Sequence, residues 1–292
     1  MADTLAGDAA PEAAQVNAAS EAAQTSAVPE ALSAATSPVR LAFDGPLAVL
    51  TLNKPPANLF DTAMLRAFSE AVGWLAANSP RGLLVRADGR VVSAGLDVEI
   101  FNEVPPDEAL AFWSAHLGIV QTLERLPCPT VFAAHSLTLT AAFEIALACD
   151  LIVATRSARF GLVERKVAFT PAMGGTQRLA QRAGVSRACE LVMTGDVYRG
   201  ETLAEWGVVN ALFPADSFHG DAHAYAMRLA TGPTRAHAAT KQILRGFQSG
   251  GVARSDEMLP KVAADLVRTR DHRRAVAAFI EHGPDHTTRY DG

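Results

Sequence analysis

The sequence contains few cysteines and no uninterrupted apolar run of membrane length. Among its 292 residues there are three cysteines, Cys128, Cys149 and Cys189. They are widely spaced and form no CxxC pair, which is typical of core thiols in a reducing compartment and excludes a disulfide-stapled scaffold. The most apolar stretch, residues 129–154, is interrupted by His135, Glu144 and Asp150, so it does not read as a membrane span. We therefore predict a soluble, cytoplasmic protein with no membrane partner.

Basic side chains are absent from the first 39 residues, which contain five acidic ones. The formal net charge of -5 therefore comes from this segment, and residues 40–292 carry 26 side chains of each sign. A body without a basic excess argues against nucleic acid as a partner. The segment is Ala-rich, has few larger apolar residues and lacks the signature of a secretory or mitochondrial leader. We predict a disordered, acidic tail over residues 1–39.

The usual short motifs for nucleotides, metals and serine nucleophiles are also missing. The glycine-containing loops at 93–97 and 171–176 match neither a GKS/T phosphate loop nor GxGxxG. The histidine pairs 219/223 and 282/286 have i,i+4 spacing but no accompanying HExxH or cysteine ligands. Ser136 does not lie in a GxSxG elbow. We expect no metal site and no bound cofactor.

Hydrophobic periodicity and turn residues predict alternating strands and helices up to about residue 180. Strands are expected at 39–43, 47–52, 83–85, 129–134 and 151–154. Helices are expected after Asp61, after Asp107 and over 141–148, then at 187–193, 222–229, 234–247 and 256–280. The pattern indicates an α/β fold whose last part is all helical.

Two carboxylates are the clearest candidates for chemistry. Glu144 is the one charged side chain in the apolar segment 141–148, and a buried carboxylate is costly unless it is paired or used. A structural role, in which the buried carboxylate pairs with a distant Arg or caps backbone donors, explains this pattern equally well. Glu164 is followed by Arg165 and Lys166, and such a charged cluster is often merely solvated. The residues alone leave both interpretations open.

Seven segments, in order and spacing, resemble the motifs of the enoyl-CoA hydratase/isomerase family of the crotonase superfamily, over about residues 40–290. They are LNKPPANL at 52–59, VSAGLD at 92–97, 144–150, FGLVE at 160–164, GGTQRL at 174–179, TGD at 194–196 and 204–210. The resemblance implies a spiral of ββα units over 40–215 and a C-terminal helical region, 216–292, that packs trimers, often paired into hexamers. It also implies an acyl-CoA substrate.

The resemblance implies a reaction as well: addition of water across the 2,3 double bond of an enoyl-CoA. Glu144 would act mainly as base toward the water, and Glu164 would supply the proton to the α-carbon. The backbone N–H groups of Leu96 and Ala141 would form the oxyanion hole for the thioester oxygen, where preorganised donors stabilise developing charge.

Three further positions are implied to bind coenzyme A. The carbonyl of Ala94 would contact the adenine, Lys54 is the candidate for a CoA phosphate, and Asp97 would order its loop. The basic side chain usual before the Asn58 position is replaced by Ala57.

The chain departs from the family pattern in ways that keep alternatives open. Thr140-Ala141-Ala142 replaces a glycine triplet, Phe143 places a large ring next to Glu144, and Val163 replaces a proline. The segments 55–58 and 93–97 look closer to Δ3,Δ2-enoyl-CoA isomerases, which rely on the carboxylate at the Glu164 position. A non-catalytic acyl-CoA-binding homologue is the third interpretation, motivated by the altered segment 135–143.

Overall fold

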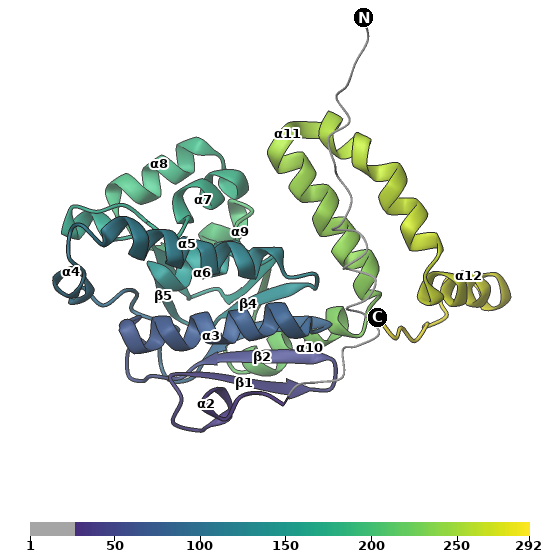
Figure 1. Ribbon diagram of the computed structural model, residues 1–292, viewed down its shortest axis with the longest axis horizontal. Helices are drawn as coiled ribbons and strands as arrows, with labels where there is room; N and C mark the ends of the chain where they lie inside the picture. Colours follow the sequence, from purple (N-terminus) through teal and green to yellow (C-terminus); the bar gives the residue numbers. More distant parts are fainter. Residues whose placement is uncertain (1–26) are drawn as a thin grey trace, which may run out of the picture.

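A computed structural model describes residues 27–292 and contains two sheets (Figure 1). The larger sheet has the order β1-β2-β3-β4-β6-β9 and is parallel except for the β1–β2 hairpin. Its strands are β1 (Val39–Asp44), β2 (Leu47–Leu52), β3 (Gly82–Ala87), β4 (Thr130–Ala134), β6 (Leu151–Thr155) and β9 (Ala211–Phe213). The smaller sheet, β5-β7-β8, comprises β5 (Leu137–Leu139), β7 (Arg159–Gly161) and β8 (Tyr198–Arg199).

The chain passes repeatedly from a strand of the large sheet to the small sheet and then into a helix, as in β4-β5-α6. This is the predicted spiral of ββα units. The helices of this part are α3 (Thr62–Asn78), α4 (Ile100–Glu103), α5 (Ala109–Arg125), α6 (Ala141–Ala148), α7 (Gly175–Ala183), α8 (Val185–Thr194) and α9 (Gly200–Glu205). Asp61 caps α3 by accepting the N–H of Met64, as its position predicted. Strands β5, β7, β8 and β9, each two or three residues long, were not predicted because so short a run carries no periodicity.

Two apolar clusters hold the sheets and helices together. The main cluster includes α3, α6 and the buried rings of Phe60, Phe68, Phe132 and Phe143. The second lies where α10 (Phe218–Ala230) packs on the large sheet, with Leu84 and Val131 among its members. A Cβ at Gly82 of β3 would lie 2.7 Å from the Cβ of Ala230, so α10 approaches the sheet at a position that requires glycine.

The segment just before β1 is packed on the core, unlike the predicted tail. Residues 1–26 lie outside the described part of the chain, so the prediction there is not addressed. Residues 27–39, however, include α2 (Glu30–Ser33), whose Leu32 is only 2% exposed. The side chain of Asn53 donates to the carbonyls of Ala35 and Ser37. The prediction of disorder was wrong for residues 27–39, because their few apolar groups bury against distant parts of the chain rather than against each other.

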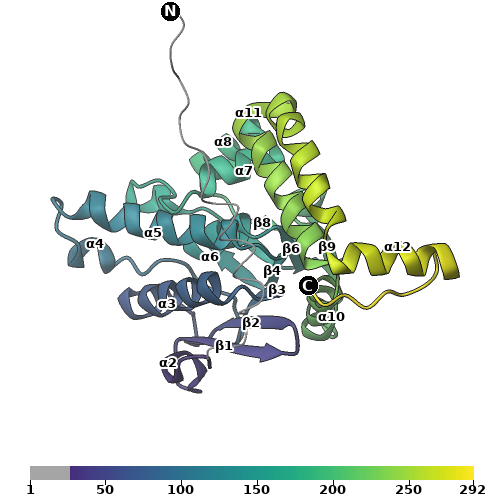
Figure 2. The same cartoon turned by 45° about the vertical axis from the view of Figure 1, so that its right-hand side comes forward.

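The C-terminal helices project from the sheets (Figures 1 and 2). Helix α11 (Thr234–Val267) bends at Gly250 and Gly251, where the backbone leaves helical geometry. Helix α12 (Arg270–His282) begins after Thr269, whose hydroxyl accepts the N–H of His272. The single helix predicted over 256–280 is therefore wrong, because this cap interrupts it.

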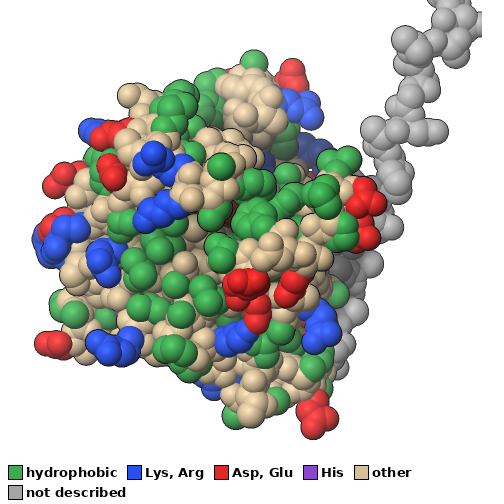
Figure 3. Space-filling model, turned by 90° about the vertical axis from the view of Figure 1, so that its left-hand side faces the viewer, with side chains coloured by type: hydrophobic (Ala, Val, Ile, Leu, Met, Phe, Trp, Pro, Cys, Tyr) green, Lys and Arg blue, Asp and Glu red, His purple; other side chains and the backbone are tan. Residues whose placement is uncertain are grey.

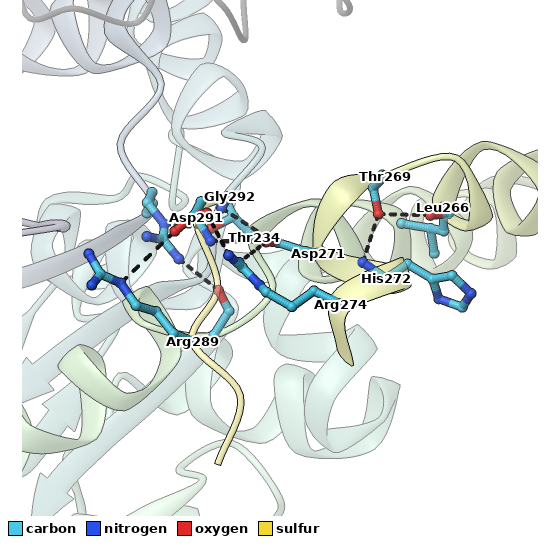
Figure 4. A network of polar contacts seen from close by, with 11 residues as sticks. Thr234, Leu266, Thr269, Asp271, His272, Arg274, Arg289, Asp291 and Gly292 are labelled. Atoms are coloured by element: carbon cyan, nitrogen blue, oxygen red, sulfur yellow. Dashed lines mark hydrogen bonds and ion pairs between the residues drawn. The ribbon is translucent and has the colours of Figure 1, made fainter. Parts of the chain in front are cut away.

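Polar contacts connect this region internally and to the core. Near the end of the chain, Asp271 accepts the N–H groups of Asp291 and Gly292, and Arg274 pairs with both Asp271 and Asp291 (Figure 4). Lys241 of α11 donates to Asp150 at 2.8 Å and to the carbonyl of Cys128 at 2.9 Å. Because Lys241 is buried, this ion pair fixes α11 to the start of β6.

The surface mixes charges of both signs. On the face drawn in Figure 3, acidic and basic side chains lie among apolar ones, and no field of one sign covers it. This agrees with the equal numbers of acidic and basic residues in 40–292. Within residues 27–292, none of the helices combines the length and apolarity that crossing a bilayer would take.

Candidate active site

A cavity of about 190 Å³ lies at the start of α6 and contains most of the predicted site residues. Five of them line it: Ala94, Leu96, Ala141, Glu144 and Glu164. These residues come from three separate stretches of the chain. The cavity therefore brings together the two predicted carboxylates and both predicted oxyanion loops.

The loop that contains Ala94 and Leu96 is held in place by Asn58. This side chain is fully buried, accepts the N–H of Lys54 at 2.6 Å and donates to the carbonyls of Asp88, Val91 and Val92. A parallel bridge between Phe60 and Leu96 continues the connection. Asn58 thus joins the turn at 54–58 to the loop at 88–96 and fixes one wall of the cavity.

Glu144 is buried in the first turn of α6 and held by backbone groups of another segment. Its side chain is 3% exposed, and Oε1 accepts the N–H of Met173 and of Gly175, each at 2.9 Å. These bonds favour the ionised form, yet burial and the nearby Glu164 prevail and raise the pKa of Glu144 to about 8. The structural alternative is therefore met in part: Oε1 accepts backbone N–H groups, whereas Glu144 makes no direct ion pair within residues 27–292.

Glu164 enters the same cavity from a 3₁₀ turn, η1 (Glu164–Val167). Burial raises its pKa to about 7. Within the described residues its Oε2 is buried without a hydrogen-bond partner. A buried, unpaired carboxyl oxygen is costly, and Glu164 is one of the residues that line the cavity. The interpretation of Glu164 as merely solvated is therefore wrong.

The two predicted oxyanion N–H groups differ in their surroundings. Ala141 is the first residue of α6, so its N–H is among those that have no carbonyl partner within the helix. The N–H of Leu96, in contrast, donates to the hydroxyl of Thr140 at 2.7 Å. Because Leu96 N–H already has this partner, it does not stand free for a thioester oxygen as we had expected.

The remaining predicted CoA positions are Lys54 and Asp97, which do not line the cavity. Lys54 pairs with Asp61. The carboxylate of Asp97 accepts the N–H of Glu99 at 3.1 Å, and its own N–H donates to the carbonyl of Phe60. These two hydrogen bonds connect Asp97 to its own loop and to Phe60.

The rest of the cavity wall is mostly apolar and contains three aromatic rings. Phe101 and Phe169 lie 5.0 Å apart between ring centroids, and Trp113 lies 5.1 Å from Phe169. All three rings line the cavity. Sequence reasoning did not find this wall, because its members lie in α4, in α5 and after η1. Phe143, by contrast, packs against Phe160 at 5.2 Å and is not a lining residue.

Sequence reasoning also missed the support behind Glu144. Arg178 makes two hydrogen bonds to Glu124, at 2.6 and 3.0 Å, and a third to the carbonyl of Gly174 at 3.2 Å. It therefore holds the turn that presents the N–H of Gly175 to Glu144. The adjacent glycines in GGTQRL were the available signal, since a Cβ at Gly175 would lie 2.7 Å from Cγ of Glu144.

No group of three or more His, Cys, Asp or Glu side chains suited to a metal ion occurs within residues 27–292. The titratable residues that line the cavity are Glu144, Glu164 and Lys166. Such a site can exchange protons with a bound molecule and donate backbone hydrogen bonds to it.

Comparison with known proteins identifies relatives over most of the chain. The family described as Enoyl-CoA hydratase/isomerase matches residues 43–289. A mitochondrial methylglutaconyl-CoA hydratase of Mus musculus is 30% identical over 257 residues, covering 84% of this chain and 80% of the relative. A 2,3-dehydroadipyl-CoA hydratase of Escherichia coli (strain K12) is 29% identical over 239 residues, covering 80% and 91%. The crystal structure of an enoyl-CoA hydratase from Bacillus anthracis has a TM-score of 0.80 at 25% identity, covering 87% of this chain and 99% of that one.

Proposed function

The chain belongs to the enoyl-CoA hydratase/isomerase family of enzymes that act on acyl-CoA, with the α/β crotonase fold predicted, and we propose that it adds water across the 2,3 double bond of an enoyl-CoA. One observation carries the proposal. Glu144 and Glu164 line a single cavity, and burial raises the pKa of both carboxyls toward neutrality. Carboxyls with pKa values near the working pH are suited to general acid–base catalysis.

In the proposed reaction, the two glutamates handle one water molecule. Glu144 accepts a proton from the water while the oxygen of the water forms a bond to C3 of the substrate. Glu164 donates a proton to C2, so the double bond is replaced by a new C–O and a new C–H bond. Negative charge develops on the thioester oxygen meanwhile, and the N–H of Ala141 with the positive end of the α6 dipole stabilises it.

This chemistry requires one proton on the two carboxyls together: Glu164 must be protonated and Glu144 ionised when the substrate reacts. The nearby Glu164 disfavours ionisation of Glu144 and adds to the effect of burial on its pKa. In the free protein the higher pKa belongs to Glu144, at about 8, against about 7 for Glu164. A water between the carboxyls can exchange the proton before the substrate reacts, which gives Glu164 its role as proton donor.

Coenzyme A would approach through the loop at 94–97. The carbonyl of Ala94 is proposed to contact the adenine, with the loop ordered by Asp97. Lys54 would bind a phosphate, for which it has to exchange its partner Asp61. The Phe101, Trp113 and Phe169 rings would surround the acyl chain, which favours an apolar acyl group near the reacting carbons.

Replacing each glutamate with glutamine tests the proposed hydration. We expect Glu144→Gln and Glu164→Gln each to lower kcat for crotonyl-CoA by about 10²–10⁴-fold, the usual contribution of a general acid or base. Mass spectrometry would follow the gain of one water. Glu70→Gln, on the exposed side of α3, is the matched control. Normal turnover in both site variants would exclude the mechanism.

Isomerisation of a 3-enoyl-CoA by Glu164 alone is the second candidate function. It is favoured by Oε2 of Glu164, which has no hydrogen-bond partner within residues 27–292, while Oε1 of Glu144 already has two backbone donors. In that case Glu144→Gln would be nearly silent, Glu164→Gln would be inactive, and the product would have the mass of the substrate.

A non-catalytic acyl-CoA-binding role is the third, and it is motivated by the occupied N–H of Leu96. Calorimetry would then detect acyl-CoA binding, while no enoyl-CoA would be converted. Any measurable hydration or double-bond shift that depends on Glu164 rules this role out.

We also propose that α11 and α12 pack against other copies of the chain in a trimer or hexamer. Both helices expose large apolar side chains, among them Phe247 (53%), Phe279 (58%) and Ile280 (79%). Such exposure over projecting helices is typical of an interaction surface.

A further inference from the structure

Thr140 makes an unusual contact for a residue at the start of a helix. It is the N-cap residue of α6, where a threonine hydroxyl normally accepts an N–H of the first helical turn. Its side chain makes no such bond. Instead Oγ1 extends to another loop and accepts the N–H of Leu96, 44 residues away in sequence, at 2.7 Å.

The backbone holds Thr140 in this position against its own preference. Its φ of 45° and ψ of -118° are unfavourable for a β-branched residue. The N–H of Thr140 donates to the carbonyl of Gly161 at 2.9 Å, and its carbonyl accepts the N–H of Glu144 at 2.9 Å. A strained residue fixed at both ends, at the edge of a cavity, indicates a functional role for its side chain.

The Thr140 hydroxyl has one proton still to donate. Thr140 lines the same cavity as Ala141 and Glu144. Within residues 27–292 the hydroxyl accepts from Leu96 and donates to no protein acceptor. A hydroxyl that accepts a hydrogen bond is polarised and becomes a better donor. Its proton is therefore available to an acceptor oxygen in the cavity.

We propose that the Thr140 hydroxyl, rather than the N–H of Leu96, is the second donor to the thioester oxygen, beside the N–H of Ala141. This inference rests on the proposed function. The N–H of Leu96 acts through Thr140 by orienting and polarising the hydroxyl. Thr140 keeps its proton throughout, so it stabilises charge and takes no part in proton transfer. The thioester oxygen then lies one hydroxyl group farther from Leu96 than a direct bond would place it.

Three substitutions separate the donor from its surroundings. Thr140→Ser keeps the hydroxyl, Thr140→Val replaces it with a methyl of similar size, and Thr140→Gly removes the side chain and frees the N–H of Leu96. We expect the kcat of Thr140→Ser for crotonyl-CoA to stay within about threefold of wild type. The kcat of Thr140→Val should fall about 10²–10³-fold, as for loss of one oxyanion-hole donor. KM should change less than kcat. The kcat of Thr140→Gly should be lower than that of wild type but higher than that of Thr140→Val.

A spectroscopic readout distinguishes this inference from the hydration proposal. Butyryl-CoA has no double bond to hydrate, so infrared difference spectra with a ¹³C-labelled thioester report only the hydrogen bonds to its carbonyl. The band of the bound carbonyl should lie at the same frequency in wild type and Thr140→Ser. It should move to higher frequency in Thr140→Val. If these frequencies are observed but wild type does not hydrate crotonyl-CoA, the hydration proposal is contradicted while the role of Thr140 is supported.

Two results would overturn the role of Thr140. One is a Val variant with wild-type kcat and carbonyl frequency. The other is a Gly variant with higher kcat than wild type, because the hydroxyl would then merely block Leu96. If circular dichroism shows that Thr140→Val does not fold, Thr140→Ala provides the same comparison. An unchanged kcat and carbonyl frequency in Thr140→Ala would then contradict the role of Thr140.

Discussion

Gly175 donates its backbone N–H to Oε1 of Glu144 at 2.9 Å, and a Cβ on Gly175 would lie only 2.7 Å from Cγ of the same glutamate. The proposed catalytic carboxylate is thus both bonded and sterically confined by one glycine. Its position depends on the absence of a side chain at residue 175.

Gly175→Ala should therefore displace Glu144 and lower kcat by at least about tenfold, since small displacements of a reacting group are costly. Steady-state kinetics with crotonyl-CoA would measure this. Gly73→Ala is the matched control, because it lies mid-helix in α3 with nothing within 4 Å of the added Cβ. The control should keep full activity and gain about 0.5–1 kcal/mol of stability. Equal activity in both variants would contradict the confinement of Glu144.

The raised pKa values predict how stability depends on pH. Glu144 and Glu164 ionise near pH 8 and 7 in the folded protein, against 4.5 normally. Between these values the folded state binds protons that the unfolded state has released. The free energy of unfolding should therefore fall as pH rises from about 4.5 to about 8, by up to about 1.4 kcal/mol per pH unit for each fully buried group.

Urea unfolding of wild type and Glu144→Gln across this pH range measures the effect. The variant should lose less stability with rising pH, because glutamine does not ionise. Glu164 is only partly buried, so its variant should show a smaller change. If the free energy of unfolding depends on pH equally in wild type and in both variants, the pKa of Glu144 is not raised by folding.

The packed segment before β1 should contribute measurably to stability. Leu32→Ala removes a side chain that is 2% exposed in the main core, and we expect a loss of about 2–3 kcal/mol in chemical denaturation. Leu110→Ala, at a leucine that is 81% exposed, should change stability by less than about 0.5 kcal/mol. Equal effects of the two substitutions would show that α2 is not held against the core in solution.

The proposed oligomer predicts a role for the exposed rings and chains of α12. The double variant Phe279→Asp with Ile280→Asp should dissociate a trimer or hexamer, because the charges would be buried in the contact. Light scattering after size exclusion would measure the mass. Ala76→Asp with Ala77→Asp, on an exposed turn of α3, provides the control. An unchanged mass in the α12 variant would place the contact elsewhere.

Family, fold and the two carboxylates could be predicted because their signals lie in short contiguous segments. The apolar run 141–148 with its single glutamate predicted α6 to the residue, and the ordered motifs identified the family that matches residues 43–289. The i,i+1 neighbours of Glu144 were less informative. Phe143 was expected to crowd the site, but adjacent residues on a helix face different directions, and its ring packs on Phe160.

Other features depend on contacts between segments far apart in the chain, so no local pattern indicates them. The Thr140 hydroxyl meets the N–H of Leu96 only because the loop at 93–97 folds over the start of α6. The raised pKa of Glu144 comes from burial and from Glu164, and the burial of Leu32 comes from distant parts of the core. Sequence thus specified which groups are present, while folding set their distances and their access to water, on which hydrogen bonding and ionisation depend.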